Sequence, residues 1–479
     1  MNIRMVLRTL GYVLGAESAL LLLPLLTAAL YRENPVPFLI PLLALGICAL
    51  ILCRIRVKEK TIYAREGFLI VSLSWILVSL AGAVPFVLAG AIPSYIDAVF
   101  ETVSGFTTTG ASILTDVEAL PRGLLFWRSF THWIGGMGVL VFIMAVLPLA
   151  NDRSMHVMRA EVPGPSVGKI VPRARHTAIW LYGIYLGLTA VEVVFLLAGG
   201  MPLFDSLVNT FGTAGTGGFA IKNASIGFYN SAYVDGVITV FMLLFGINFN
   251  LYFLLLMRDF KQVLKSEELR VYLGTALAAM FLIAFNILPQ YSGFGEAFRL
   301  SSFQVSSIMT TTGFATADYT MWPSFSQTIL FLLMILGACG GSTGGGLKIS
   351  RAIILVKSLG REVVRMVHPR AVGAVRLDGK RVDDQTTRDV GVFFIAYIFI
   401  IFIMTLLVSL DGFGFATTFS AVAACMGNIG PGLGAVGPMG NFADFSVASK
   451  LLLSLTMLLG RLEIFPLVLF FTPVLYRKR

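Results

Sequence analysis

The sequence predicts an all-α polytopic membrane protein with two N-terminal spans followed by four pseudo-symmetric helix, loop, helix repeats. Three observations support this fold class. The 479 residues are 57% hydrophobic and only 13% charged, with a mean hydropathy of +0.84, whereas about a quarter of the residues in soluble proteins are charged. Ten apolar runs are long enough to cross a bilayer core of about 30 Å as helices. One short polar pattern recurs four times along the chain.

The ten predicted spans are located by length and hydropathy. They lie near residues 7–31, 35–53, 68–92, 124–150, 178–200, 232–257, 270–289, 325–347, 390–410 and 446–472. The first follows two arginines, as a signal peptide does, but it has no convincing cleavage site and runs into further spans, so we expect it to be retained. The chain then divides into an N-terminal two-helix region, 1–67, and four repeats, 68–150, 151–257, 258–351 and 352–479.

Lysine and arginine placement predicts the orientation, because basic loops stay cytoplasmic. With the N-terminus inside, the cytoplasmic segments hold 29 of the 36 lysines and arginines, and the C-terminus is also cytoplasmic. The formal charge of +10 follows from this bias and favours contact with anionic membrane lipid. Short loops offer no folded basic surface, so no nucleic-acid partner is expected.

Cysteines and histidines argue against several other classes of protein. The four cysteines, Cys48, Cys53, Cys339 and Cys425, lie in or beside predicted spans, so no outer disulfide framework is indicated. The four histidines show no metal-ligand spacing, and only His132 lies within a span. Because no nucleophile and base converge, the sequence does not indicate an enzyme.

A four-fold internal repeat is the most informative pattern. Four blocks align on one glycine: ETVSGFTTTGAS (101–112), NTFGTAGTGGFA (209–220), QVSSIMTTTGFA (304–315) and VAACMGNIGPGL (422–433). The aligned glycines are Gly110, Gly218, Gly313 and Gly430, and a small residue stands six positions before each, at Ser104, Gly212, Ser307 and Ala424. Asp97 and Asp205 stand 13 residues before their glycines, where we expect them to N-cap short helices.

Each block lies between two predicted spans, and the apolar piece before its glycine is too short to cross the membrane. The repeat is therefore interpreted as helix, re-entrant half-helix, pore-loop, helix. Irregular backbone at membrane depth is tolerated only inside protein or beside a watery cavity. Four such loops meeting on one axis predict a central pore lined by backbone and threonine oxygens, and the negative ends of the half-helix dipoles favour a cation there. The alternative is close helix packing through small residues.

With these repeats, the chain resembles the Trk/Ktr/HKT superfamily of potassium transporters, most closely the bacterial Trk-type potassium-translocating subunits. The similarity covers essentially the whole chain. Its most specific segments are TTTGAS (107–112), GTGGFA (215–220), TTTGFA (310–315), GNIGPG (427–432), GACGGSTGGGLKISR (337–351) and MLLGRLEIFP (457–466). The resemblance implies K+ as the transported ion, no organic cofactor, a place in the bacterial cytoplasmic (inner) membrane, a homodimer with a pore in each protomer, and cytoplasmic regulatory subunits with nucleotide-binding domains.

The resemblance also implies a selectivity filter at the four loops. The residues expected to hold the ion are Thr108, Thr109, Gly110, Thr216, Gly217, Gly218, Thr311, Thr312, Gly313, Asn428, Ile429 and Gly430. The fourth loop has no threonine and the second has one, so the ring is not four identical ligand sets. Each repeat shares one glycine where a tetrameric potassium channel uses two. We therefore expect fewer well-formed sites and weaker exclusion of sodium.

A glycine-rich segment interrupts the span after the third loop. Gly341 and Gly346 have the spacing of a phosphate-binding loop, but Leu347 replaces the required lysine and the preceding run is a span, which argues against nucleotide binding. A break in a span is better explained as a movable plug beside the cavity, as the resemblance also implies. The expected gate comprises Gly340, Gly341, Ser342, Thr343, Gly344, Gly345 and Gly346, with Lys348 beside it.

Arg461 lies within the last span, where an arginine is expensive and usually faces a cavity or a partner. It either pairs locally with Glu463 or projects beneath the loops as a positive barrier. The resemblance favours the barrier, so Arg461 joins the expected gating residues.

Other residues at membrane depth have weaker interpretations. Asn248 and Asn250 either line the cavity or form interhelical hydrogen bonds, and Glu17 and Glu192 have no evident partner and no assigned role. The spans after the loops carry mid-span glycines, for which close helix packing is the simplest explanation. These are Gly135, Gly246, Gly337 and Gly460. Carboxylates beside the pore units, among them Asp97, Glu101 and Asp235, are expected to concentrate cations at an outer mouth.

The sequence therefore predicts potassium uptake through the loops, down the electrochemical gradient and without ATP hydrolysis in this chain. A membrane potential near 100 mV supplies about 2.3 kcal/mol per charge. A sodium- or proton-coupled cation symporter remains the alternative, because the sequence does not decide whether a coupling site is present.

Overall fold

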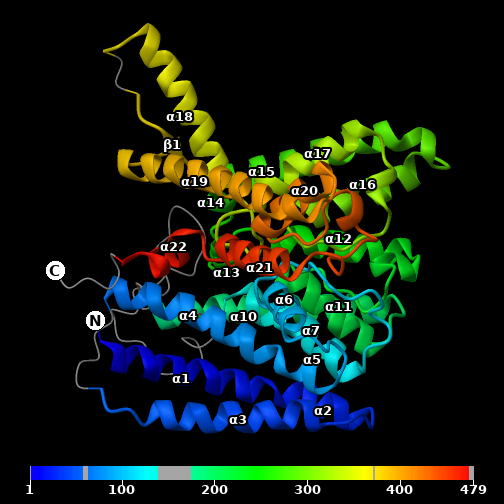
Figure 1. Ribbon diagram of the computed structural model, residues 1–479. Coiled ribbons are helices and arrows are strands. Elements are labelled where there is room, and N and C mark those ends of the chain that lie inside the picture. Colours follow the sequence, from blue (N-terminus) through cyan, green and yellow to red (C-terminus); the bar gives the residue numbers. More distant parts are fainter. Residues whose placement is uncertain (1, 58–62, 139–173, 371–372, 474–479) are drawn as a thin grey trace.

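The computed structural model describes residues 2–57, 63–138, 174–370 and 373–473, and this part of the chain is mostly helical. The long helices run side by side, with both termini at the same end of the bundle (Figure 1). A short hairpin of β1 (Arg376–Leu377) and β2 (Lys380–Arg381) pairs antiparallel with Arg376 opposite Arg381. The predicted all-α membrane architecture is thus confirmed.

Two antiparallel helices form the N-terminal region. Helix α1 (Ile3–Leu20) continues almost directly into α2 (Leu22–Leu30), and α3 (Val36–Cys53) returns along it. The two approach closely because glycines face the contact: a Cβ on Gly11 would lie 2.7 Å from the Cβ of Leu52. The Ser18 hydroxyl also donates a hydrogen bond to Leu42 O at 2.7 Å, so small and hydroxyl residues join the pair.

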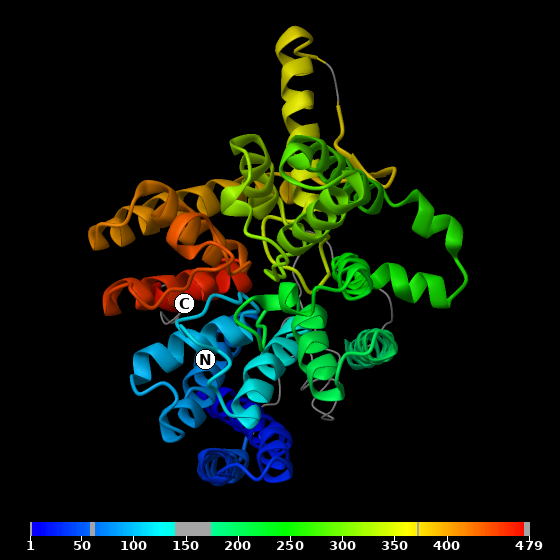
Figure 2. The ribbon, with the colours of Figure 1, turned by 90° about the vertical axis from the view of Figure 1, so that its right-hand side faces the viewer.

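Each repeat contains a long first helix, a short buried helix that ends at its loop, and a second helix that leaves the loop. The first helices are α4 (Ala64–Gly82), α10 (Ala174–Ala198), α15 (Glu267–Ile287) and α19 (Asp384–Val408). The short helices are α6 (Tyr95–Phe106), α11 (Leu203–Gly215), α16 (Phe294–Met309) and α20 (Phe415–Gly427). The second helices are α7 (Arg122–Gly136), α12 (Ala232–Phe245), α17 (Ser324–Leu336) and α21 (Val447–Arg461). The four repeats are arranged around a common centre (Figure 2).

The remaining elements connect these units. They are α5 (Val84–Leu88), α13 (Phe249–Leu256), α14 (Phe260–Lys265), α18 (Ile349–Val367), α22 (Phe465–Phe471) and single 3-10 turns at Ser225–Tyr229, Leu288–Gln290, Tyr319–Met321, Ser409–Asp411 and Gly434–Val436. Helix α18 projects outward beyond the bundle (Figure 1). Repeat 4 meets repeat 1 where the Ser72 hydroxyl donates to Pro466 O at 3.1 Å.

The second helices differ from the prediction, because none of them continues as one helix across the expected span. Helix α12 ends at Phe245 and the chain turns by 91° into α13, and α17 and α21 end at Leu336 and Arg461. Helix α7 ends at Gly136, and residues 139–150 of its expected span lie outside the described residues. Consequently only six helices in the described chain are long and apolar enough to span a membrane, or seven if the bent pair is one span.

The predicted helix caps are also wrong. Ser94, not Asp97, caps α6 by accepting the amide hydrogen of Asp97, and Pro202 precedes α11. Asp97 and Asp205 lie within the first helical turn instead, where a carboxylate still interacts favourably with the helix dipole. Asp97 forms an ion pair with Lys450 at 2.9 Å, and Asp205 accepts a hydrogen bond from the Tyr229 hydroxyl at 2.8 Å.

Candidate functional site

The four loops share one unusual backbone conformation. The residue two positions before each aligned glycine has a positive φ, between 54° and 60°, although three of the four are threonines. These residues are Thr108, Thr216, Thr311 and Asn428. The aligned glycines also have positive φ, 79° at Gly110, 73° at Gly218, 86° at Gly313 and 94° at Gly430. β-Branched residues rarely adopt this region, so the surrounding structure holds the loops in a strained shape.

Backbone hydrogen bonds to the short helices hold that shape. In every repeat, the amide of the residue before the aligned glycine donates to the carbonyl of the small residue identified from the sequence. The four pairs are Thr109 N to Ser104 O (2.8 Å), Gly217 N to Gly212 O (2.9 Å), Thr312 N to Ser307 O (2.8 Å) and Ile429 N to Ala424 O (2.9 Å). A larger side chain is excluded at least at Gly212, where a Cβ would lie 2.7 Å from the Phe314 ring.

The loops form a closed ring in chain order. A Cβ on each aligned glycine would collide with a carbonyl oxygen of the next loop, and the fourth loop meets the first. The contacts join Gly110 to Gly217 O, Gly218 to Thr312 O, Gly313 to Ile429 O and Gly430 to Thr109 O. Only glycine fits where backbones approach this closely, which explains why this residue alone recurs in all four blocks.

The ring presents oxygen atoms that the described chain does not use. Among the described residues, no hydrogen bond ends on the carbonyl oxygens of the twelve residues predicted to hold the ion. All four short helices end at the ring, so their negative dipole ends point to it. Buried carbonyls normally have partners. Four sets of unpaired carbonyls around one centre can instead replace the hydration shell of a monovalent cation.

Two of the threonine hydroxyls in the loops, those of Thr109 and Thr312, have hydrogen-bond partners within the protein. Thr109 Oγ1 lies 2.8 Å from Thr107 Oγ1 and accepts a hydrogen bond from the Asn428 amide at 3.0 Å. Thr312 Oγ1 lies 2.8 Å from Thr310 Oγ1 in the same way. The Thr109 hydroxyl thus has partners within loop 1 and in loop 4, and the Thr312 hydroxyl has a partner within loop 3. The fourth loop, which lacks threonine, is tied to the first by Asn428.

The glycine-rich segment lies directly against the ends of two short helices and their loops. Gly345 N donates to Thr311 Oγ1 at 2.7 Å. A Cβ on Gly344 would lie 2.8 Å from Thr310 O, and one on Gly345 would overlap Gly427 O. The segment therefore packs beneath loops 3 and 4 with no room for side chains at these positions.

Residues 339–343 fill the break after α12. Thr343 Oγ1 donates to Phe245 O at 3.2 Å and Cys339 N donates to Gly246 O at 3.1 Å, which satisfies the carbonyls freed at the end of α12. Phe249 N donates in return to Gly341 O at 3.0 Å. Helix ends buried in a membrane protein need such partners. The mid-span Gly246 thus marks a helix end occupied by another segment rather than simple helix packing.

Arg461 reaches the glycine-rich segment and the end of α7. Its Nη1 donates to Thr343 O at 2.9 Å, while Nη2 donates to Gly136 O at 2.8 Å and also to Gly135 O. It therefore links the end of α7 to the segment beneath the loops. Glu463, the alternative partner considered from the sequence, forms an ion pair with Arg351 at 2.5 Å.

Two further charged groups hold the base of the segment. Buried Lys348 donates through Nζ to Gly344 O. Glu268 Oε1, near the start of α15, accepts Gly340 N at 2.7 Å and Ser350 N at 3.2 Å. One carboxylate oxygen thus joins both ends of the segment and caps α18, whose own N-cap Lys348 offers no acceptor. Sequence reasoning missed Glu268 because it stands in a cytoplasmic-looking run, SEELR, far from residue 340 in the chain.

The structure also describes the other polar residues that the sequence analysis singled out at membrane depth or beside the pore units. Asn248 caps α13 by accepting Asn250 N at 3.0 Å, and Glu17 and Glu192 are buried without a geometrically satisfactory hydrogen-bond partner among the described residues. Glu101 and Asp235 do not face an outer mouth. They are 1% and 3% exposed and pair with Arg128 and Arg299.

Exposed carboxylates do lie outside the ring, between the exits of loops 1 and 2. Glu118 pairs with Lys222 at 2.8 Å, and the Asn223 side chain donates to Asp116 Oδ1 at 2.8 Å. The hydrogen bond from Lys222 is the main cause that lowers the pKa of Glu118, and that from Asn223 lowers the pKa of Asp116. Both carboxylates are therefore ionised at neutral pH and connect the two loops.

Comparison with known proteins agrees with this geometry. The TrkH family, described as a cation transport protein, matches residues 40–475. The Trk system potassium uptake protein TrkH of Halomonas elongata is 37% identical over 100% of both chains, and the protein of that name from Escherichia coli is 35% identical over 100% of both. The crystal structure of the potassium transporter TrkH from Vibrio parahaemolyticus covers 100% of both chains with a TM-score of 0.89 and 34% identity.

These matches extend over the N-terminal helices, all four repeats and the glycine-rich segment. They confirm the resemblance seen in the sequence, and they place the chain among transporters rather than enzymes. The chain therefore belongs to the TrkH family of cation transport proteins.

Proposed function

We propose that this protein takes up potassium across the bacterial cytoplasmic membrane through a carbonyl filter formed by the four loops. The observation that carries the proposal is the closed ring of loops, whose carbonyl oxygens receive no hydrogen bond from the described chain. The names of the relatives, potassium uptake proteins, agree with it. The proposed ligands are the backbone oxygens of residues 108–110, 216–218, 311–313 and 428–430.

The proposed mechanism is replacement of water by these oxygens. A K+ ion entering from outside exchanges its hydration shell for the ring, and the four helix dipoles stabilise the charge. Unequal loops form fewer complete sites than four identical ones, so sodium is excluded less strictly than in a tetrameric channel. The membrane potential drives the ion inward, since about 100 mV supplies roughly 2.3 kcal/mol per charge.

The glycine-rich segment, residues 340–346, is the proposed gate. It lies beneath loops 3 and 4, and it is held by hydrogen bonds rather than by apolar side chains. Arg461 adds a positive charge beside the path, which opposes cation passage in the closed state. Opening then requires displacement of residues 342–345 and of the Arg461 head group.

The partners proposed from the sequence also have support. Exposed apolar side chains on projecting α18, Val356, Leu359, Val363, Met366 and Val367, support a homodimer, because such a face is rarely left uncovered. The basic segment 348–390 begins at the gate and continues on the cytoplasmic side, which supports contact with a nucleotide-binding regulatory subunit there. Exposed leucines on α2, α3 and α19 support contact with lipid.

Each proposed repeat, 68–150, 151–257, 258–351 and 352–479, contributes one loop to this ring. The N-terminal helices, in the proposed region 1–67, pack outside it.

Purified protein in liposomes tests the proposed function. We expect K+ influx that follows an imposed negative-inside potential and exceeds Na+ influx under the same potential. The sodium- or proton-coupled symporter makes the opposite prediction: K+ uptake would follow a Na+ or H+ gradient when the driving force on K+ itself is zero. That result would replace the proposed mechanism.

A further inference from the structure

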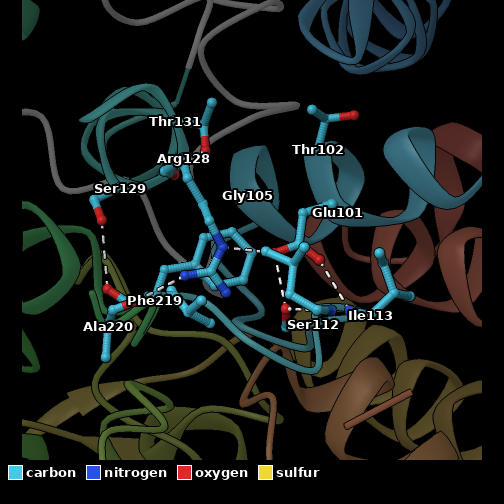
Figure 3. A network of polar contacts seen from close by, with 12 residues as sticks. Glu101, Thr102, Gly105, Ser112, Ile113, Arg128, Ser129, Thr131, Phe219 and Ala220 are labelled. Atoms are coloured by element: carbon cyan, nitrogen blue, oxygen red, sulfur yellow. Dashed lines mark hydrogen bonds and ion pairs between the residues drawn. The ribbon is translucent and has the colours of Figure 1, made fainter. Parts of the chain in front are cut away.

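An ion pair lies buried behind the first two loops. Glu101, on the short helix α6, accepts a hydrogen bond from Arg128 Nε on α7 at 2.6 Å. The side chains are 0% and 3% exposed, respectively. Figure 3 shows the two side chains facing each other between the segments that leave loops 1 and 2.

Glu101 holds the segment that leaves loop 1, residues 111–113. Its Oε1 accepts the Ser112 hydroxyl at 2.9 Å and its Oε2 accepts Ile113 N at 3.0 Å (Figure 3). Ser112 and Ile113 follow Gly110 by two and three residues. The carboxylate therefore fixes the backbone immediately after the first loop, with both oxygens engaged.

Arg128 holds the segment that leaves loop 2, residues 219–220. Its Nη1 donates to Ala220 O at 2.9 Å, and its guanidinium carbon lies 3.6 Å from the Phe219 ring centroid. Ser129, the next residue on α7, donates to Phe219 O at 3.4 Å. A planar guanidinium offers donors in several fixed directions, so the Arg128 side chain joins Glu101 to the segment that leaves loop 2.

In the described chain, the other repeats lack an ion pair equivalent to Glu101–Arg128. Nine residues before the aligned glycine, where repeat 1 has Glu101, stand Asn209, Gln304 and Ala421. The Gln304 amide donates to Ala317 O at 3.2 Å, and the Asn209 amide donates to the Tyr229 hydroxyl at 3.1 Å. An uncharged brace is thus present in repeats 2 and 3, whereas Ala421 offers no polar group. The ion pair bridges two loops, and the described chain holds no equivalent pair in the other repeats.

Stability alone does not explain a fully buried ion pair. Desolvation offsets most of the attraction between two buried charges, and apolar replacements of equal volume are often as stable. The pair does, however, fix the positions of the two loop exits relative to each other, because Glu101 engages both carboxylate oxygens and Arg128 donates from both Nε and Nη1. These two segments directly follow residues 108–110 and 216–218, so their positions affect the distance between the carbonyl oxygens of loops 1 and 2.

We propose that Glu101 and Arg128 are positioning residues for ion selectivity, which join loops 1 and 2 at the spacing that favours K+ over Na+. This inference rests on the proposed filter. It predicts that the pair affects discrimination between the ions more than it affects total flux, since neither side chain reaches the ions.

The test compares Arg128→Lys, Glu101→Gln and the double variant Glu101→Gln/Arg128→Gln, purified and placed in liposomes or planar bilayers. Lysine keeps the charge but cannot reach Glu101 and Ala220 O together. The double variant leaves no unpaired buried charge, so it keeps the test valid if a single variant folds poorly. The reversal potential with K+ on one side and Na+ on the other gives the permeability ratio. We expect the K+ preference to fall about tenfold, which corresponds to ~1.4 kcal/mol of discrimination.

The Asp97–Lys450 pair is the matched control. Asp97 lies one turn before Glu101 on α6, and its partner on α21 is 2.9 Å away, but neither residue has a hydrogen bond to a loop exit. Asp97→Asn/Lys450→Gln should keep the wild-type ratio. A second readout is thermal unfolding, in which K+ should stabilise the wild type more than Na+ does, because a ligand stabilises the state that binds it. The Glu101 and Arg128 variants should lose that difference.

The outcomes separate this inference from the proposed function. If wild-type protein prefers K+ and Gly313→Ser relaxes that preference, but the pair variants keep the wild-type ratio, the positioning role is wrong and the filter stands. If the wild type shows no K+ preference, the filter itself is wrong. If none of the three variants enters the membrane as folded protein, the pair is needed for folding instead, and the inference is overturned.

Discussion

Arg461 donates a hydrogen bond to Thr343 O over 2.9 Å, although 118 residues separate them in the sequence. The contact places the guanidinium on the tip of the glycine-rich segment and, through Gly136 O, on the end of α7. We propose that this one side chain combines two roles, a positive charge near the proposed ion path and a clamp on the proposed gate.

Replacing Arg461 with alanine should raise K+ flux without changing the K+ to Na+ ratio. At an effective dielectric of about 20, two like charges some 8 Å apart repel by roughly 2 kcal/mol, so removal of the charge predicts an increase of about tenfold or more. Arg461→Lys separates the two roles, because it keeps the charge and loses the forked donation. Tracer flux into liposomes is the measurement. Unchanged flux in inserted Arg461→Ala protein would leave Arg461 as a structural link only.

Deleting residues 342–345 should give high flux that no longer responds to a regulatory subunit. The shortened segment cannot reach Thr311 or Arg461, and glycines make a continuous helix there unfavourable by roughly 1 kcal/mol each. Flux with and without the bound partner is the comparison. Loss of all flux in correctly inserted protein would show that the segment is part of the conduction path and that the gate lies elsewhere.

Gly313→Ser should relax the preference for K+ over Na+. Gly313 has φ of +86°, and a Cβ there would meet Ile429 O and lie 2.9 Å from Pro431 Cδ, so both the backbone shape and the contact between loops 3 and 4 change. Gly412→Ser is the matched control, because Gly412 has φ of +80° with nothing within 4 Å. Reversal potentials compare the two. Equal ratios in both variants would contradict the filter assignment.

Glu268→Gln should loosen the base of the glycine-rich segment. The carboxylate accepts Gly340 N and Ser350 N, and replacing charge-assisted hydrogen bonds by neutral ones costs about 1 kcal/mol. Cys339 is a natural reporter, since it directly precedes the segment and is 0% exposed. With Cys48, Cys53 and Cys425 replaced by alanine, a water-soluble thiol reagent should label Cys339 about fivefold faster in the Glu268→Gln protein.

Glu267→Gln provides the control for that labelling experiment. Glu267 pairs with exposed Lys357 at 2.5 Å and makes no hydrogen bond to residues 340–346 in the described chain. Its labelling rate should match the wild type. Equal rates in the Glu268 and Glu267 variants would show that Glu268 does not restrain the segment.

The repeats and loops were predictable because the same requirement recurs in each block of the sequence. A glycine forced by close backbone contact must recur wherever the contact recurs, and Gly110, Gly218, Gly313 and Gly430 all meet the next loop. Each loop has two residues with positive φ, and only the glycine was recognisable from the sequence. Threonine at 108, 216 and 311 hides a conformation that asparagine at 428 would have suggested.

Long-range contacts explain what the sequence did not predict. The hydropathy of 232–257 is continuous across Gly246, so nothing in it signals a 91° turn whose carbonyls are satisfied by residues 339–343. Glu101 resembled a mouth carboxylate because its partner is 27 residues away.

The interrupted second helices also have a mechanical consequence. A continuous rod would carry a push from the cytoplasmic surface straight to the ring of loops and would distort its oxygen spacing. Because α12, α17 and α21 stop at Phe245, Leu336 and Arg461, such a push meets hydrogen-bonded joints before it reaches the loops. One of these joints, from Gly345 N to Thr311 Oγ1, touches loop 3 itself. We therefore expect motion below the ring to reach the loops through the glycine-rich segment rather than along a continuous helix.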